Sequence, residues 1–322
     1  MKVSVALCTY NGEKYLNEQI DSILNQTRKV DEIIVCDDRS TDQTLSILKQ
    51  YKVKYPNVFK IFENATTLRS VKNFEKAIQK CSGDVIFLSD QDDIWALNKV
   101  ECYLLFFDKN PTINVVASNG YCIDENSNIH DKYAIWDVPF FLENKGVEFE
   151  FFKLISMTGN IATGASMAFK KEILVSIFPF PIIENFHHDE WIAIISSSMN
   201  QFAFINDKCF YYRIHSDQQV GGVFYKKSDY QRNMLINVFD LKNPANNFVG
   251  YKRRIKKIIS NFERNSLLEQ SDPRYSILFQ NSKKELIDLY HFNKNQMKND
   301  YPVRNFLLNF SDKFLNKRKF NY

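Results

Sequence analysis

Residues 3–12 read Val-Ser-Val-Ala-Leu-Cys-Thr-Tyr-Asn-Gly, an apolar run that stops at a polar cluster. Such a run is typical of a buried strand. From Leu16 the apolar positions recur at helical spacing, through Ile20 and Ile23. Similar strands are predicted at 32–36, 59–62 and 84–88, each separated from the next by a helix. Strands that alternate with helices predict right-handed βαβ units and a parallel sheet, which is an α/β fold.

Polar clusters follow three of these strands. Residues 8–13 come after the first strand, residues 37–42 after the second and residues 89–93 after the fourth. Ligands of open parallel sheets bind beyond the carboxyl ends of the strands. We therefore expect the three clusters to line one crevice, which is the candidate site.

Three carboxylates, Asp90, Asp92 and Asp93, stand within four residues just past the fourth strand. Carboxylates this close repel one another unless a cation neutralises them, and Mg²⁺ and Mn²⁺ bind such oxygen ligands together with substrate phosphates. An acidic turn that caps the next helix is the structural alternative. A D-x-D-x-[TV] phosphatase nucleophile is another, but Ile94 and Trp95 fit it poorly.

Asp37 and Asp38 form a second acidic pair. Carboxylates at this position accept hydrogen bonds from ribose in other nucleotide-binding folds, and the Tyr10 ring offers a surface on which a base stacks. Both features have structural alternatives, which are helix capping for the carboxylates and a plug at the strand end for Tyr10.

Two later motifs carry groups suited to catalysis. The sequence H-H-D-E-W at 187–191 opens an apolar helix, so Asp189 is either an N-cap or a general base for an attacking hydroxyl. The sequence Y-Y-R-I-H at 211–215 ends a strand-like run with Arg213 and His215, a cation and an imidazole. A single such histidine is usually structural, and its neighbours favour a metal or pyrophosphate contact.

The composition, with 44% hydrophobic and 25% charged residues in 322, is that of a globular protein. Its nine glycines form neither G-x-G-x-x-G nor G-x-x-x-x-G-K, which excludes the two commonest glycine-rich phosphate loops. No apolar stretch is long enough to span a bilayer and no signal-peptide pattern opens the chain, so we expect a cytoplasmic protein. The six cysteines form no C-x-x-C pair, and we expect neither disulfides nor a zinc site.

Positive charge concentrates after Gly222. Residues 223–322 carry 20 lysines and arginines against 9 aspartates and glutamates, whereas residues 1–222 carry 22 against 29. We predict a second domain over 223–322, with helices at 226–241, 251–268, 275–292 and 303–314, and an irregular stretch at 120–160 with a loop at 136–141. Basic, aromatic-rich helices suit an anionic membrane surface. Packing on the first domain or formation of a homodimer is the alternative.

Five motifs occur in order along residues 1–222. They are V-S-V-x-x-C-T-Y-N-G-E-K-Y-L from Val3, I-I-V-C-D-D-R-S-T-D-x-T from Ile33, L-S-D-Q-D-D-I-W from Leu88, H-D-E-W from His188 and Y-R-I-H-S-D-Q-Q-V-G from Tyr212. Together they resemble glycosyltransferase family 2, and particularly its bacterial rhamnosyltransferase-like members. The resemblance implies a GT-A nucleotide-sugar-binding domain over 1–222 with a central, mostly parallel sheet.

What the resemblance implies is an inverting transferase that moves a sugar from a nucleoside-diphosphate donor to an acceptor hydroxyl. Asp92 and His215 match positions that hold Mn²⁺ or Mg²⁺, and Asp189 matches the catalytic base. The positions that match donor-binding ones are Thr9, Tyr10, Asp37, Asp38, Asn64, Lys72, Asp90 and Arg213. The family further implies a saccharide or lipid-linked saccharide acceptor and assembly of cell-surface polysaccharide such as O-antigen or capsule. The basic, aromatic-rich residues 223–322 predict a place on the inner face of the cell membrane.

Two departures from the family pattern bear on the donor: Arg69 replaces a small residue and Gln218 replaces an asparagine. Two other functions stay open on the residues alone. A sugar-phosphate nucleotidyltransferase would need a glycine-rich basic loop, and residues 3–16 contain one glycine. A nucleic-acid-binding protein would use the basic helices, but they contain no recognised motif and the crevice would be unexplained, so we expect no nucleic-acid partner.

Overall fold

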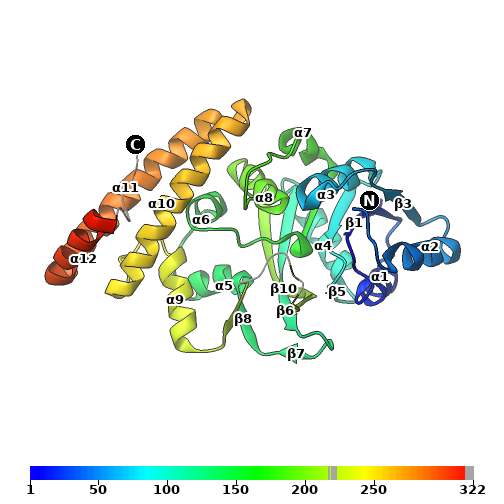
Figure 1. Ribbon diagram of the computed structural model, residues 1–322, viewed down its shortest axis with the longest axis horizontal. Helices are drawn as coiled ribbons and strands as arrows, with labels where there is room; N and C mark the ends of the chain where they lie inside the picture. Colours follow the sequence, from blue (N-terminus) through cyan, green and yellow to red (C-terminus); the bar gives the residue numbers. More distant parts are fainter. Residues whose placement is uncertain (217, 219–222, 316–322) are drawn as a thin grey trace. The chain divides into compact units, whose positions relative to one another are not determined.

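The computed structural model describes residues 1–216, 218 and 223–315. The chain forms two compact units, the first of Met1–Asp137 with Ala162–Tyr225 and the second of Val138–Ile161 with Lys226–Tyr322 (Figure 1). The domain boundary predicted at Gly222 falls outside the described residues. Residues 138–161, which the sequence analysis placed in the first domain, group with the C-terminal helices.

A mixed sheet forms the centre of the first unit, with nine strands among the described residues. Its order is β3-β2-β1-β4-β9-β6-β10-β5, and β7 pairs with β6. The strands are β1 (Val3–Thr9), β2 (Glu32–Asp37), β3 (Phe59–Glu63), β4 (Val85–Ser89), β5 (Ile94–Trp95), β6 (Val115–Ile123), β7 (Ile129–His130), β9 (Met167–Lys170) and β10 (Phe202–Arg213). A separate two-stranded sheet pairs β8 (Lys132–Ala134) with β11 (Phe224–Lys226).

The first four strands in the order, β3-β2-β1-β4, run parallel, which confirms the predicted βαβ units. Every residue of β1 and β2 is buried, because helices cover the sheet and leave no polar face. The register places Thr9 beside Asp37 and Leu7 beside Ser89. The polar clusters after these strands therefore leave the sheet at one edge. The connecting helices are α1 (Leu16–Leu24), α2 (Thr44–Lys54) and α3 (Arg69–Lys80).

Antiparallel strands extend this parallel core. β9 lies antiparallel between β4 and β6, β10 runs parallel to β6, and the two-residue β5 pairs antiparallel with β10 through Trp95 and Phe210. The sequence pattern does not predict these pairings, although the predicted α/β fold with its largely parallel core is confirmed. Pairing of β5 with β10 brings the acidic residues after β4 beside Arg213. The remaining helices of the unit are α4 (Lys99–Lys109), α7 (Leu174–Ile177) and α8 (His188–Ser198).

The second unit is helical. Its long helices lie side by side (Figure 1), with Tyr251 and Ile255 of α10 packed against Met297 of α11. None of the helices within the described ranges combines the length and apolar character needed to cross a bilayer. The helices are α5 (Val138–Asn144), α6 (Phe151–Met157), α9 (Asp229–Phe239), α10 (Phe248–Ser271), α11 (Ser276–Asp300) and α12 (Pro302–Leu315).

The irregular stretch predicted at 120–160 is wrong, because it contains the end of β6, the short strands β7 and β8, and helices α5 and α6. Pro139 suggested a loop, but it lies in the first turn of α5, where a missing N–H costs no helical hydrogen bond. The last carbonyls of α6 accept hydrogen bonds from α10, with Asn265 Nδ2 donating to Ser156 at 3.0 Å and Asn261 Nδ2 donating to Met157. These bonds satisfy the end of α6 and hold residues 138–161 in the second unit.

Candidate active site

A cavity of about 850 Å³ opens at the strand ends of the first unit. The loops after β1, β2 and β4 all contribute to its wall, which confirms the predicted convergence of the three polar clusters. The lining residues are Cys8, Thr9, Tyr10, Asn11, Gly12, Lys14, Tyr15, Asp38, Thr67, Arg69, Ser70, Asn73, Phe74, Asp90, Gln91, Asp92, His187, Tyr212, His215 and Gln218.

The two carboxylates after β2 differ in their position relative to the cavity. Asp37 is fully buried, accepts hydrogen bonds from Thr9 Oγ1 at 2.8 Å and Ser40 N at 2.9 Å, and does not line the cavity. Asp38 does line it, and accepts from the main-chain N–H of Arg69 at 2.8 Å. Asp37 therefore shapes the loop, and Asp38 is the carboxylate at the cavity wall.

Two predicted donor-binding residues lie behind the wall. Asn64 donates to Asp38 Oδ1 at 2.8 Å and is buried, so it orients that carboxylate. Lys72 forms an ion pair with Glu75 at 2.9 Å and donates to the carbonyl of Phe180 at 3.2 Å. Neither is among the lining residues. Direct contacts of Asn64, Lys72 and Asp37 with a donor stay predictions, as does the role of Asp189, which is also not among the lining residues.

Gln91 joins two of the three loops. Its side chain accepts from Tyr10 N at 2.8 Å and donates to Tyr10 O at 2.9 Å. Gly12 makes room for it, since a Cβ at that position would lie 2.3 Å from Gln91 Oε1. The pair of hydrogen bonds fixes the backbone of Tyr10, whose ring is half-exposed at the cavity.

Negative charge collects at the end of β4. Burial raises the pKa of Asp90 to about 7, and the charges of Asp92 and Asp189 add to this effect. Burial and the two neighbouring carboxylates also raise the pKa of Asp93. The fully buried Lys99 donates to the carbonyl of Ala165 at 2.6 Å, and burial lowers its pKa to about 7. The protein thus supplies limited positive charge to this cluster.

Asp92 and His215 come together across the cavity wall. Asp92 Oδ2 lies 3.0 Å from His215 Nε2, and both side chains line the cavity. His215 Nδ1 is buried without a hydrogen-bond partner, and the ring packs 5.0 Å from that of Tyr15. Residues 92 and 215 are far apart in the chain, and the pairing of β5 with β10 brings them together.

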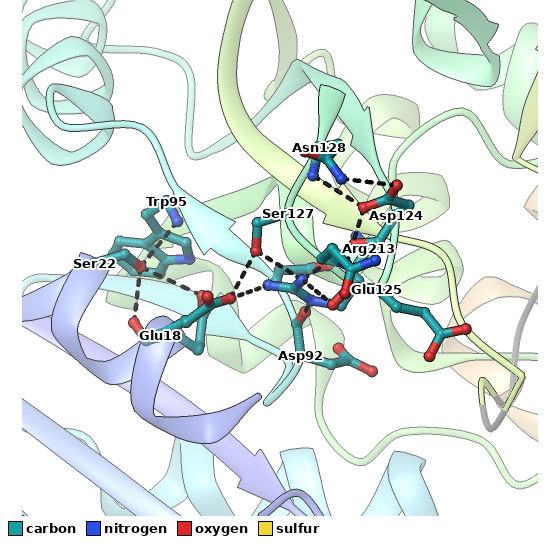
Figure 2. Close-up of polar contacts among 12 residues, drawn as sticks. Glu18, Ser22, Asp92, Trp95, Asp124, Glu125, Ser127, Asn128 and Arg213 are labelled. Carbon is teal, nitrogen blue, oxygen red and sulfur yellow. Dashed lines mark hydrogen bonds and ion pairs between the residues drawn. The ribbon is translucent and has the colours of Figure 1, made fainter. Parts of the chain in front are cut away.

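Arg213 is fully buried, and its guanidinium is engaged by protein groups (Figure 2). Nε donates to the Asp92 carbonyl at 2.8 Å, Nη1 donates to Ser127 Oγ at 2.9 Å, and Nη2 forms an ion pair with Glu18 of α1. Arg213 does not line the cavity. Arg213 therefore fixes the backbone at Asp92 and the turn at Ser127, and its diphosphate contact stays a prediction.

Asp189 lies at the first turn of α8. Its Oδ2 accepts from Gly164 N at 2.9 Å and its Oδ1 accepts from Glu190 N at 2.8 Å. A Cβ on Gly164 would lie 3.9 Å from Asp90 Oδ2, so Asp90 and Asp189 flank the same glycine. The adjacent His188 is buried, and burial lowers its pKa to about 4, so its ring is neutral near pH 7. Asp189 is thus the carboxylate of this motif that lies beside the acidic cluster.

The sequence profile described as Glycosyl transferase family 2 matches residues 4–178. The chain belongs to glycosyltransferase family 2. It is 38% identical over 124 residues to "Putative glycosyltransferase EpsE" of Bacillus subtilis, a match that covers 38% of this chain and 45% of EpsE. It is 29% identical over 252 residues to "dTDP-rhamnosyl transferase RfbG" of Shigella flexneri, covering 71% of this chain and 78% of RfbG.

Solved structures share the fold of this glycosyltransferase. S. aureus TarS 1-349, in complex with UDP-GlcNAc, aligns with a TM-score of 0.54 at 17% identity, over 93% of this chain and 92% of that one. Mannosyltransferase PcManGT from Pyrobaculum calidifontis, in complex with GDP-Man and Mn²⁺, aligns with a TM-score of 0.52 at 15% identity, over 98% and 80%. These likenesses, with the family match, confirm the predicted GT-A fold with C-terminal helices.

The glycosyltransferase offers a small donor set for a divalent cation. Over the described ranges, no cluster of three or more histidine, cysteine, aspartate or glutamate side chains is arranged to hold a metal. Asp92 Oδ2 and His215 Nε2, which face each other at the cavity, fit a cation that takes its other ligands from phosphate oxygens and water. Mg²⁺ and Mn²⁺ sites of this kind commonly use one or two carboxylates.

Several cavity-lining groups of the glycosyltransferase were not predicted as site residues. Arg69 and Lys14 are the cations on the wall, and Gln91 joins two loops. Arg69 has φ +60° at the start of α3, an uncommon conformation for a side chain of this size. Both departures from the family pattern, Arg69 and Gln218, line the cavity. These departures were the signal in the sequence that could have marked the two residues as part of the site.

Proposed function

We propose that this glycosyltransferase transfers a sugar from a nucleoside-diphosphate donor to an acceptor hydroxyl with inversion at the anomeric carbon, assisted by Mn²⁺ or Mg²⁺. The observation that carries the proposal is the meeting of two carboxylates of the loop after β4 with one carboxylate of the distant helix α8. Asp90 and Asp189 flank Gly164, and Asp92 pairs with His215 at the cavity. This arrangement supplies one carboxylate for proton transfer and a separate pair for cation binding.

The nucleoside end of the donor binds at the loops after β1 and β2. Asp38 is held by Asn64 and by the backbone of residue 69, so its carboxylate is fixed before the donor arrives. Tyr10 presents its ring for stacking on the base. Because Glu18 pairs with the Arg213 guanidinium and Glu125 pairs with Lys14 at 2.6 Å, Arg69 is the wall cation that balances the charge of the diphosphate.

Asp189 acts as the general base. Two main-chain N–H groups hold its carboxylate, which fixes the direction in which it accepts a proton. It takes the proton of the acceptor hydroxyl as that oxygen attacks the anomeric carbon and the bond to the diphosphate breaks. A single displacement inverts the configuration and needs no enzyme nucleophile. Asp92 and His215 would hold the divalent cation, which would supply neutralisation of the charge on the leaving diphosphate.

The acceptor is a saccharide or a lipid-linked saccharide in the assembly of a cell-surface polysaccharide such as O-antigen or capsule. The name of RfbG, a dTDP-rhamnosyl transferase, supports the donor class. The excess of 11 positive charges in residues 223–322 supports contact of the C-terminal region with the anionic inner face of a membrane. A homodimer is the competing use of that region.

Donor hydrolysis and transfer test the proposal. The full chain is incubated with UDP-, GDP- and dTDP-sugars in the presence of Mn²⁺, Mg²⁺ or EDTA, and nucleoside diphosphate release is measured. We expect release with one donor family, lost in EDTA, and a product of inverted configuration by NMR. Release of pyrophosphate from a nucleoside triphosphate and a sugar phosphate would instead establish a nucleotidyltransferase and overturn the proposal.

A further inference from the structure

Helix α12 carries apolar side chains on its outward face. Val303, Phe306 and Leu307 are 71%, 70% and 60% exposed, and Phe310 one turn later is 60% exposed. These positions follow the three- and four-residue spacing of one helix face. The stripe belongs to the last helix of the second unit (Figure 1).

The inward face of α12 has the opposite character. Asn305 and Asp312 are buried, and Leu308 packs on the cluster around Tyr251 and Met297. An ordinary surface helix buries its apolar stripe and shows its polar residues to water. Since α12 buries two polar residues while several large apolar ones stay outside, packing within the unit does not explain the outward stripe. Contiguous exposed apolar surface of this kind marks an interaction site.

Basic residues accompany the stripe. Lys298 and Arg304 are exposed on either side of the α11–α12 junction. Over residues 294–322 the sequence holds seven lysines and arginines against two aspartates. Of those two, Asp312 is buried and Asp300 accepts a hydrogen bond from Tyr251 Oη at 2.7 Å. Among the described residues near the stripe, the partly exposed Lys294 and the exposed Lys298 and Arg304 therefore outnumber the exposed Asp300.

We propose that the outward face of α12 lies in the interface of an anionic lipid surface, with Val303, Phe306 and Leu307 among the acyl chains and Arg304 at the headgroups. This deepens the proposed contact of the C-terminal region with a membrane and is independent of the transfer reaction. Apolar insertion and headgroup attraction act together in such interfacial helices. A symmetric contact with a second copy would instead place like charges face to face.

Vesicle co-sedimentation of the full chain tests the proposal without any sugar donor. We expect binding to vesicles of phosphatidylcholine with about one quarter phosphatidylglycerol, weak binding to pure phosphatidylcholine, and a loss of binding in high salt, because salt screens exposed charges.

Phe306→Ser with Leu307→Ser removes the centre of the stripe. We expect the partition coefficient to fall by about tenfold or more, because two large apolar side chains no longer insert. The matched control is Val53→Ser with Leu105→Ser, which removes two side chains that are 83% and 52% exposed on the first unit. The control should bind vesicles like the parent, and circular dichroism should show both variants folded.

Three results would overturn the proposal. They are parental vesicle binding by the α12 variant, no salt-sensitive binding by the parent, and a solution dimer that the α12 variant converts to monomer. Failure of donor hydrolysis would leave this outcome unaffected, since the vesicle experiment involves no donor.

Discussion

Arg213 Nε donates a 2.8 Å hydrogen bond to the main-chain carbonyl of Asp92. The same residue's main-chain N–H donates to Asp93 Oδ1 at 3.0 Å, so β10 holds the acidic loop at two points. A buried guanidinium with five donors suits this task, because each bond fixes a different segment. The loop that presents Asp92 is therefore set in place by the protein before any ligand binds.

Arg213→Lys should both destabilise the fold and weaken donor binding. A lysine reaches one or two of the present partners and leaves Glu18 and the carbonyl of Asp92 without their donors, which costs about 2–4 kcal/mol. Urea unfolding measures the first effect, and calorimetry with UDP, GDP or dTDP and Mn²⁺ measures the second. Glu18→Gln should shift both in the same direction. If the variant lost donor binding but kept the stability of the parent, the result would instead support a direct contact of Arg213 with the diphosphate.

Asp92→Ala should abolish metal-dependent binding of the nucleoside diphosphate. The variant removes the carboxylate that faces His215 Nε2 and leaves the cation without its main charged ligand. Calorimetry with and without Mn²⁺ checks this, and Asp21→Ala on α1 serves as a control for loss of one carboxylate. Equal Mn²⁺ dependence in parent and variant would show that the metal binds elsewhere.

Asp189→Asn should retain donor binding and lose transfer by about 10²- to 10⁴-fold, because an amide cannot accept the proton of the acceptor. The amide oxygen can still accept the hydrogen bond from Gly164, so the fold should be kept. Initial rates of transfer and calorimetric donor affinity separate the two effects. The neighbouring Glu190→Gln is the matched variant, and a larger rate loss there would move the base to Glu190.

Gly12→Ala should weaken nucleotide binding by displacing Gln91. The added Cβ would lie 2.3 Å from Gln91 Oε1, so the side chain that holds Tyr10 must move. We expect about a tenfold loss of affinity with a small change in unfolding free energy. In a Gln91→Ala background, Gly12→Ala should add little, since the two changes act through one contact. Additive losses would contradict this explanation.

Glu32→Gln should destabilise the protein near neutral pH and not at low pH. Burial would raise the pKa of Glu32, but hydrogen bonds from Lys60, Ser4 and Ser82 outweigh it and lower the pKa to about 2. A lowered folded-state pKa gives stability that is present above the unfolded value near 4.5 and is lost as pH falls toward 2. Denaturant unfolding at pH 7 should separate parent and variant by about 1–3 kcal/mol. At pH 2 to 3 the difference in unfolding free energy should shrink. A difference that stays constant with pH would refute the assignment of this stability to the ionised Glu32 carboxylate.

The strand-end parts of the site could be predicted from sequence, because the ends of parallel strands meet at one edge wherever the strands are identified. The direction of Arg213 could not. The position of the guanidinium depends on two contacts that are distant in the sequence. One is with Glu18 of α1, and the other is with Ser127, which lies in the turn between β6 and β7 about 90 residues earlier in the chain. Helix α6 was missed for a similar reason, since its stabilising partner, α10, lies about 100 residues further along the chain.

The hydrogen bonds from Asn261 and Asn265 to the end of α6 have a consequence for the expression of shortened forms of this protein. A polypeptide stopped at residue 222 would retain the segment 138–161 but lose the helices that cover it. Leu154, Ile155 and Met157, all buried in the intact chain, would then face solvent. Such a fragment should aggregate, whereas one that also replaces 138–161 with a short glycine-serine connection should remain dispersed.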